Sequence, residues 1–450
     1  MRPYFVVFCL AVIGLGTLPH AYAKTENASQ DSAQSLLQVF LDAMDASPAL
    51  RIAHSKLSIG RAQRAQARGQ LLPQISATGN FSDNDQSYPD ETTPDTSFEG
   101  EKYGVQLQQV LFNWQAFANR KRATFVVDQK EAEYYNSLGL LLLDTSDRYF
   151  AVLGAEDKLA LVLAEREATD QQLKQAESHF KRKLIKVTDL YEVRARAATI
   201  RSDEIDAESE VALTKEALWE VSGNEISGLY RLNSAIEFPD VNGSLESWVA
   251  KALQSNALLK SRESAINAAE QTISERRGAH YPVVKFVASR QKSDLGYENT
   301  QTAKRLITYY GIDVSVPIYT GGSSSARVKE AFHMAEIAKS EHEMTRRELV
   351  KRTRAAYLSA KSSIKRISAA QYAVEAANAS AMAMRKGFTL GTVTTVDVLD
   401  ALQQQFGAQR DLQQAKYAYI QALLNLKKEA GSIDKGDIEE INSWLLPPGA

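Results

Sequence analysis

The chain of 450 residues contains a single cysteine, Cys9, which lies in an apolar stretch near the N-terminus. That stretch, Phe5–Leu18, follows the positively charged Arg2 and precedes the small residues of Ala21–Ala23. A positive start, an apolar centre and an A-x-A site are typical of a secretory signal peptide, which we assign to residues 1–23. The mature chain would then have no thiol, which excludes disulfides and cysteine-based metal sites.

Long apolar runs and a strong charge imbalance are also missing. The longest apolar candidate after the signal peptide is Leu138–Leu143, far shorter than the about 20 residues that a membrane-spanning helix needs. The formal net charge is −2, which argues against a nucleic-acid partner. A secreted chain of this kind is either soluble or inserts as a β-barrel, whose alternating strands keep the mean hydropathy low.

The sequence has no HExxH, P-loop or GxGxxG motif, so no catalytic constellation is recognisable. Its histidines after the signal peptide are scattered and lack ligand-like partners one helical turn away, so we interpret them as solvated or packed. They are His54, His179, His280, His333 and His342. We therefore expect no enzymatic activity, no cofactor and no metal site.

What the sequence does contain is an internal repeat. Three segments in the first half resemble three in the second half, in the same order and at nearly constant spacing. RGQLLPQISATG resembles RGAHYPVVKFVAS, YGVQLQQVLFN resembles YGIDVSVPIYT, and HFKRKLIKVTDLYEV resembles GFTLGTVTTVDVLDA. We predict two structural repeats, residues 24–222 and 245–430, separated by residues 223–244 and followed by a tail, 431–450.

Both repeats are predicted to contain a helix, two strands joined by a polar loop, a very long helix and a shorter one. The first has a helix at 36–69, strands at 74–82 and 103–112, and helices at 115–180 and 189–221. The second has a helix at 245–278, strands at 283–290 and 309–319, and helices at 323–388 and 395–430.

The strand predictions rest on alternation, as in Ile312, Val314, Val316 and Ile318, and the strand lengths suit a tilted barrel strand. An ordinary antiparallel sheet with one wet face is the alternative. Helices of this length would measure about 100 Å, and their apolar residues recur at coiled-coil spacing. A free-standing coiled coil would not explain the strand pairs joined to the helix ends.

The segments VPIYTGG (Val316–Gly322) and GTVTTVDVLDA (Gly391–Ala401), together with the repeat, resemble the TolC-like outer-membrane channel proteins of Gram-negative export systems. The resemblance implies a mixed α/β membrane protein that forms a homotrimer. A twelve-stranded β-barrel, four strands per chain, would sit in the outer membrane, and a long α-helical coiled-coil barrel would continue it through the periplasm. Residues 223–244 and 431–450 would then be equatorial segments.

The resemblance also implies a function. The protein would be the exit duct of a tripartite efflux or type I secretion system, with a periplasmic adaptor (membrane fusion) protein and an inner-membrane transporter of RND, ABC or MFS type as partners. A secreted or periplasmic coiled-coil scaffold or adhesin without a pore is the alternative.

The turn before the last helix of the second repeat carries two aspartates. Gly391 would form the turn, and Thr394 with Asp397 fits a T-x-x-D helix cap. Asp400 lies beyond the unpaired amides of the helix start, so capping does not explain it. Positions i and i+3 share a helix face, so in a trimer the two aspartates would form stacked rings that favour cations and raise one another's pKa. We predict that these rings form the pore constriction.

The corresponding turn of the first repeat is basic, and Asp189 with Glu192 fits a D-x-x-E cap. In the family that the sequence resembles, a tyrosine and an arginine of the second turn lock the periplasmic entrance by bonding an acid of the first. Here those positions hold Phe388 and Val393, with the acid at Asp189. We expect Asp189 at the entrance, with Lys183 or Lys186 of a neighbouring hairpin pairing with the aspartates instead.

Overall fold

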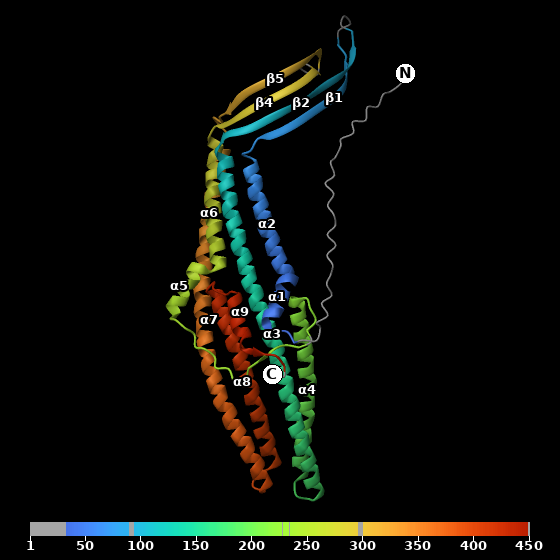
Figure 1. The fold of residues 1–450 in the computed structure, drawn as a ribbon, viewed down its shortest axis with the longest axis vertical. Helices are drawn as coiled ribbons and strands as arrows, with labels where there is room; N and C mark the ends of the chain where they lie inside the picture. The colour runs from blue at the N-terminus through green and yellow to red at the C-terminus, as the bar shows by residue number, and fades with distance from the viewer. Residues whose placement is uncertain (1–32, 90–93, 227, 234, 296–299, 449–450) are drawn as a thin grey trace, which may run out of the picture.

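The computed structural model describes residues 33–89, 94–226, 228–233, 235–295 and 300–448. These residues form an elongated body with a small β-sheet at one end and long helices along the rest of its length (Figure 1). The mixed α/β architecture expected from the sequence is confirmed. The predicted signal peptide and Cys9 lie outside the described residues.

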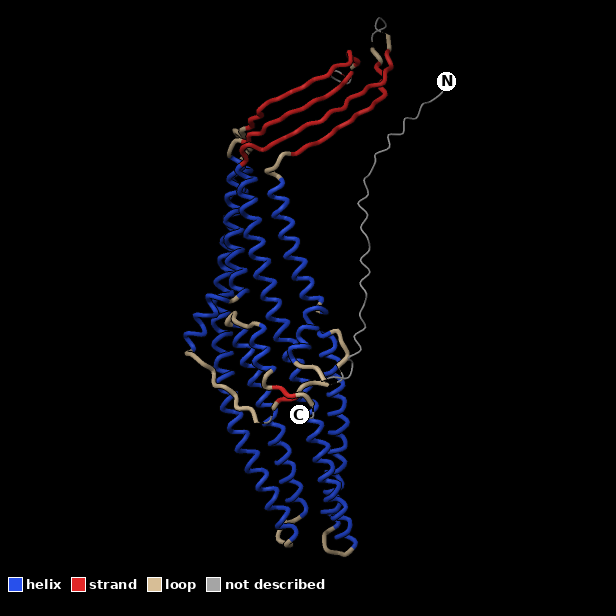
Figure 2. The backbone as a smooth tube through the Cα atoms, viewed as in Figure 1, coloured by secondary structure: helices blue, strands red, loops and turns tan. Residues whose placement is uncertain are grey.

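The sheet is antiparallel and has the strand order β1-β2-β4-β5. Its strands are β1 (Gln74–Gln86), β2 (Thr96–Asn113), β4 (Val283–Leu295) and β5 (Gln301–Ser315). β2 pairs with β4, so the two hairpins, one from each half of the chain, lie side by side in a single sheet (Figure 2). Both outer strands, β1 and β5, have one edge without a strand partner among the described residues.

The strand ends differ from the sequence prediction at the turns. The first hairpin is longer than predicted, because Ser82–Gln86 continues the ladder against Thr96–Gly100 despite its polar composition. β5 starts earlier than predicted and ends at Ser315, which faces the first residue of β4. Val316 and Ile318 therefore lie beyond the sheet, 54% and 96% exposed. Their apolar alternation continues past the point where the partner strand stops.

The helices fall into two similar sets, with β3 (Arg231–Leu232) in the segment between them and β6 (Leu445–Leu446) near the C-terminus. The first set is α1 (Leu36–Ala46), α2 (Pro48–Gly69), α3 (Trp114–Lys181) and α4 (Val187–Ser222). The second set is α5 (Leu245–Ser255), α6 (Ala257–Arg277) with the short 3₁₀ helix η1 (Gly278–His280), α7 (Ser323–Thr389), α8 (Thr395–Glu429) and α9 (Lys435–Asn442). None of the helices in the described ranges combines the length and the apolar character that crossing a bilayer requires.

The prediction of single unbroken helices over 36–69 and 245–278 was wrong. Ser47 interrupts the first in an extended conformation, and its side chain accepts a hydrogen bond from the backbone N–H of Leu50. Asn256 interrupts the second in the same way and accepts from the N–H of Leu259. Each residue ends one helix and caps the next, so the chain bends at the corresponding place in both halves.

The longest helix, α3, changes its neighbours along its length. It packs against α2 and α6 on the sheet side of the molecule, and against α4 and α8 toward the opposite end (Figure 1). Its 68 residues correspond to a rod of about 100 Å. One continuous helix therefore connects the sheet to the far end of the molecule.

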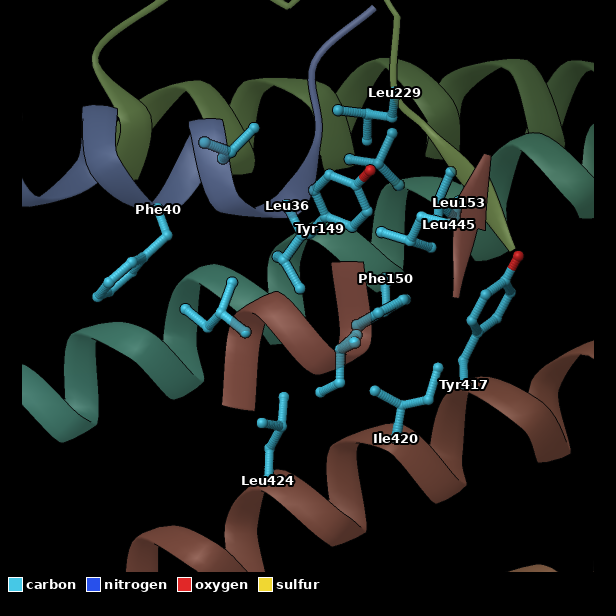
Figure 3. Packing of buried hydrophobic residues seen from close by; sticks show 14 of the residues in the cluster. Leu36, Phe40, Tyr149, Phe150, Leu153, Leu229, Tyr417, Ile420, Leu424 and Leu445 are labelled. Carbon is cyan, nitrogen blue, oxygen red and sulfur yellow. The ribbon is translucent and has the colours of Figure 1, made fainter. Parts of the chain in front are cut away.

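The main core lies at the middle of α3, and we call it the equatorial cluster. Tyr149 and Phe150 of α3 pack there with Leu36 of α1 and with Ile420 and Leu424 of α8 (Figure 3). The buried Tyr149 hydroxyl donates to the backbone carbonyls of Tyr230 at 2.9 Å and Gln34 at 3.3 Å, so its polar atom is satisfied. This cluster fixes the middle of the long helices and leaves their lower ends as two hairpins.

Candidate functional site

Two helical hairpins end together at the pole opposite the sheet (Figure 1). The first tip joins α3 to α4 through residues 182–186, and the second joins α7 to α8 through residues 390–394. All the site residues predicted from the sequence lie in or beside these two tips.

The second tip is a short turn followed by a capped helix. Gly391 has a φ of 76°, a left-handed conformation that glycine adopts without strain. Thr394 caps α8, because its hydroxyl accepts from the N–H of Asp397 at 3.2 Å. The Asp397 carboxylate in turn accepts from the Thr394 N–H at 2.9 Å and from its hydroxyl at 2.6 Å. The capping contact expected between these two residues is therefore present.

Asp397 and Asp400 are both exposed, while the two residues between them are buried. The Thr394 hydroxyl and N–H hold the pKa of the Asp397 carboxyl below its usual value. Within one chain the pKa of Asp397 is therefore lowered. The rise predicted for stacked rings of aspartates would require carboxylates from several copies of the chain. Among the described residues, Asp400 has no hydrogen-bond or ion-pair partner in the chain, so its local environment does not explain its position.

The first tip has the same length, and one of its residues is strained. Lys183 has a φ of 61°, which is uncommon for a residue with a side chain. α4 begins at Val187 with Lys186 at the N-cap position and without a side-chain cap. The predicted Asp189 cap was therefore wrong, because the helix starts two residues earlier. Asp189 is half-buried in the first turn and accepts a hydrogen bond from the Thr188 hydroxyl at 3.0 Å.

Two contacts join the hairpins within one chain. Leu399 of α8 packs into a small cluster with Leu190 and Val193 of α4, which explains why it is buried between the exposed aspartates. His179 of α3 stacks on Phe388 of α7, with ring centroids 5.7 Å apart and an interplanar angle of 17°. Sequence reasoning predicted only that His179 was solvated or packed.

The lysines predicted to pair with aspartates do not do so within one chain. Lys183 and Lys186 are exposed, and no ion pair between them and Asp189, Asp397 or Asp400 occurs in the described part of the molecule. The first tip therefore presents unpaired positive charge, and the second presents unpaired negative charge at Asp400.

The described ranges contain no candidate metal centre. No group of three or more histidine, cysteine, aspartate or glutamate side chains gathers there in a way that could hold a metal ion. A cavity of about 870 Å³ opens beside the equatorial cluster, lined by residues of α1, α3 and α6 and of the segment after α8. Its walls mix apolar side chains such as Phe40 and Tyr135 with separate charges such as Lys260 and Glu263.

The small sheet and the long helical body have the fold of outer-membrane channels of the efflux and secretion class, whose helices extend into the periplasm. The chain belongs to the family described as Outer membrane efflux protein, whose model matches residues 40–224 and again residues 248–432. This membership favours a channel over a scaffold or an enzyme and places the protein in the outer membrane of a Gram-negative bacterium.

Individual relatives agree with this assignment. The chain is 29% identical over 435 residues to the outer membrane protein TolC of Escherichia coli K12, covering 94% of this chain and 87% of TolC. It is 27% identical over 415 residues to the alkaline protease secretion protein AprF of Pseudomonas aeruginosa, covering 90% and 86%. The solved structure of the Campylobacter jejuni CmeC outer membrane channel has the same fold, with a TM-score of 0.78, 17% identity and coverage of 91% and 89%.

Proposed function

We propose that the protein is a homotrimer that serves as the exit duct of a tripartite efflux or type I secretion system. The observation that carries this proposal is the four-stranded sheet with two open edges, joined directly to a layer of long helices. Unpaired strand edges are normally covered or paired, because their free N–H and C=O groups invite a partner strand. Pairing β5 of one copy with β1 of the next closes twelve strands from three copies.

The lateral edges of the helical layer support the same arrangement. α7 exposes large apolar side chains, including Phe332, Ile337 and Leu358 at 50%, 59% and 60%. On the other edge, Ile59 of α2 is 56% exposed and Leu213 of α4 is 68% exposed. Apolar side chains on both edges are matched when α7 of one copy packs against α2 and α4 of its neighbour, which buries both sets.

The partners follow from the function of the relatives. AprF and the proteases secretion protein PrtF of Dickeya chrysanthemi are named for secretion, and both resemble this chain over most of its length. A channel of this kind needs an energised inner-membrane transporter of RND, ABC or MFS type and a periplasmic adaptor that holds the two together. Chemical cross-linking in intact cells, followed by purification of the tagged channel, tests this by whether a transporter and an adaptor are recovered together.

At the entrance, Asp397 and Asp400 of three copies form two rings of exposed carboxylates that favour cations. Val398 and Leu399 are buried between them, so both acids lie on the exposed side of α8, as the rings require. Asp189 lies on the neighbouring hairpin, and the unpaired Lys183 and Lys186 pair with these acids across the subunit boundary. Gly391 and Thr394 hold the turn that places the rings.

Planar-bilayer recordings of the Asp397→Asn, Asp400→Asn double variant test the entrance. We expect a weaker preference for cations and an altered single-channel conductance. Asp203→Asn, Asp206→Asn is the matched control, because these exposed acids have the same spacing on α4 but lie about 24 Å along the helix from its start. Unchanged selectivity in the first variant, or equal changes in both, would refute the rings.

The lysines have a separate test. Lys183→Gln, Lys186→Gln should raise the resting open probability, because the pairing that closes the entrance is lost. Removing the two neighbouring charges with Lys181→Gln, Arg182→Gln should have a smaller effect. An open probability equal to that of the wild type in the first variant would count against the pairing.

A further inference from the structure

The two faces of the sheet differ in chemistry, and the strand register assigns each residue to one of them. Side chains alternate between faces along a strand, and directly paired residues share a face. One face carries apolar residues such as Ile75, Val105, Ile312 and Val314, exposed by 52% to 71%. The opposite face carries polar residues such as Gln106. In the proposed barrel, the apolar face contacts lipid and the polar face lines the pore.

Two cations on β4 interrupt the apolar face. Arg290 lies between Val105 of β2 and Thr308 of β5, and Lys292 lies between Tyr103 and Leu306. Both are exposed. A shallow hollow of about 450 Å³ adjoins them, lined also by Ala77, Tyr103, Val105 and Leu306. The small side chain of Ala77 leaves open space beside the two cations.

Neither side chain forms an ion pair with another described residue. No carboxylate oxygen lies within 4.0 Å of Arg290 or Lys292 in the part of the chain that the structure describes. One step further along the strands, Lys304 is paired with Glu101 at 3.6 Å and Asp294 at 4.0 Å. Lys292 instead places its ammonium 5.6 Å from the centre of the Tyr103 ring. Arg290 and Lys292 therefore lack a carboxylate in ion-pair contact, and the Glu101 and Asp294 carboxylates act on Lys292 only over a longer distance.

The strand geometry places Lys292 near the outer edge of the apolar band and Arg290 two residues below it. Val283 begins β4 beside the helices, and Lys292 is nine residues further along. At about 3.3 Å per residue and a tilt of about 40°, Lys292 stands roughly 23 Å above Val283 and Arg290 roughly 18 Å above it. The apolar band of an outer-membrane barrel is about 25 Å tall. Because the helices extend into the periplasm, this edge faces the outer leaflet.

We propose that Arg290 and Lys292 form a binding site for the phosphate groups of a glycolipid headgroup in the outer leaflet, with Tyr103 and Leu306 packing against the lipid beside it. The proposal rests on the barrel described under the proposed function. A guanidinium binds phosphate through two parallel hydrogen bonds, and an ammonium supplies a second positive charge. At the edge of the hydrocarbon region such a phosphate neutralises cations that the protein leaves unpaired.

The experiment measures binding of bisphosphorylated lipid A to the purified full-length protein in detergent, alongside its dephosphorylated form. The Arg290→Gln, Lys292→Gln variant should bind the phosphorylated form about tenfold more weakly, because two charge-assisted contacts are lost. Lys102→Gln, Arg305→Gln is the matched control. Lys102 and Arg305 are both paired with Ser293, one residue from Lys292, and point to the opposite face. This control removes the same charge at the same height and should bind like the wild type.

Three results would overturn the site: equal binding by the Arg290→Gln, Lys292→Gln variant and the wild type, equal weakening in the control, or equal binding of dephosphorylated lipid A. Displacement by inorganic phosphate at the same concentration would also overturn it, since the site would then be a simple anion site. The exchange Arg290→Lys, Lys292→Arg keeps both charges and should retain binding, which separates lost contacts from misfolding.

Bilayer conductance of the same preparations separates this inference from the proposed function. A wild-type protein that neither inserts nor conducts refutes the channel. A wild-type protein that conducts but binds both forms of lipid A equally refutes only the lipid site.

Discussion

The half-buried carboxyl of Asp147 on α3 provides a test of the electrostatics of the helical body. Burial, and to a lesser extent the neighbouring Asp144 carboxylate, raise the pKa of Asp147 from 3.8 to about 6. The folded state therefore binds a proton between pH 4 and 6 that the unfolded chain has already released. Protonated Asp147 therefore favours the folded state relative to ionised Asp147. This stabilisation is complete below pH 4 and is lost as the pH rises through 6.

The size of the effect follows from the shift. About two pKa units correspond to roughly 3 kcal/mol at pH 7, which we reduce to about 1–2 kcal/mol because Asp147 is only half-buried and an asparagine amide must also be desolvated. Asp147→Asn should therefore raise the midpoint of thermal unfolding at pH 7 by roughly 1–2 °C in a chain of 450 residues. The gain should shrink toward pH 5 and be absent at pH 4.

The assay is thermal unfolding of the purified protein in detergent, followed by circular dichroism from pH 4 to 8. Asp144→Asn is the control, because Asp144 is exposed and pairs with Arg148 at 3.1 Å, so its loss should be neutral or slightly destabilising at pH 7. If Asp147→Asn changes the midpoint equally at pH 4 and pH 7, the reasoning from burial is wrong.

Three further predictions concern turns and caps. Thr394→Ala removes the N-cap of α8 and should destabilise its first turn by about 1 kcal/mol, seen as faster amide hydrogen exchange there, whereas Thr394→Ser should exchange like the wild type. Gly431→Ala should reduce the yield of folded protein, because φ is 66° and the added Cβ would lie 2.6 Å from the backbone of Ser255. Gly407→Ala, in an open helical position, should fold normally, and equal yields would contradict this explanation. Lys183→Gly should stabilise the first tip by about 1 kcal/mol, measured as slower proteolysis at the tip; faster cleavage would show that the left-handed residue is not strained.

The sequence predicts features that depend on neighbouring residues. The alternation around Ile312 indicates a strand, and Thr394 with Asp397 indicates a helix start, because both signals depend on backbone geometry within a few residues. The helix breaks at Ser47 and Asn256 have similar local signals, since both residue types favour N-caps. These signals were missed because the apolar pattern continues across both positions.

Contacts between segments that are distant in the sequence cannot be predicted from such local patterns. His179 and Phe388 are 209 residues apart, and their ring stacking depends on where two long helices end relative to one another. The exposure of Val316 and Ile318 has a similar cause. Their own alternation indicates a strand, but the partner strand β4 begins only at Val283, which pairs with Ser315, so no β4 residue lies opposite them. In both cases the outcome depends on the partner segment rather than on the local sequence.

The uninterrupted length of α3 has a mechanical consequence. From Tyr149, held in the equatorial cluster, to Lys181 at the tip, the helix spans 32 residues, or about 48 Å. If this part of α3 rotates as a rigid rod about the equatorial cluster, a tilt of about 5° moves the tip by roughly 4 Å. A displacement of the tip by several ångströms therefore corresponds to only a small rotation of the helix at the equatorial cluster.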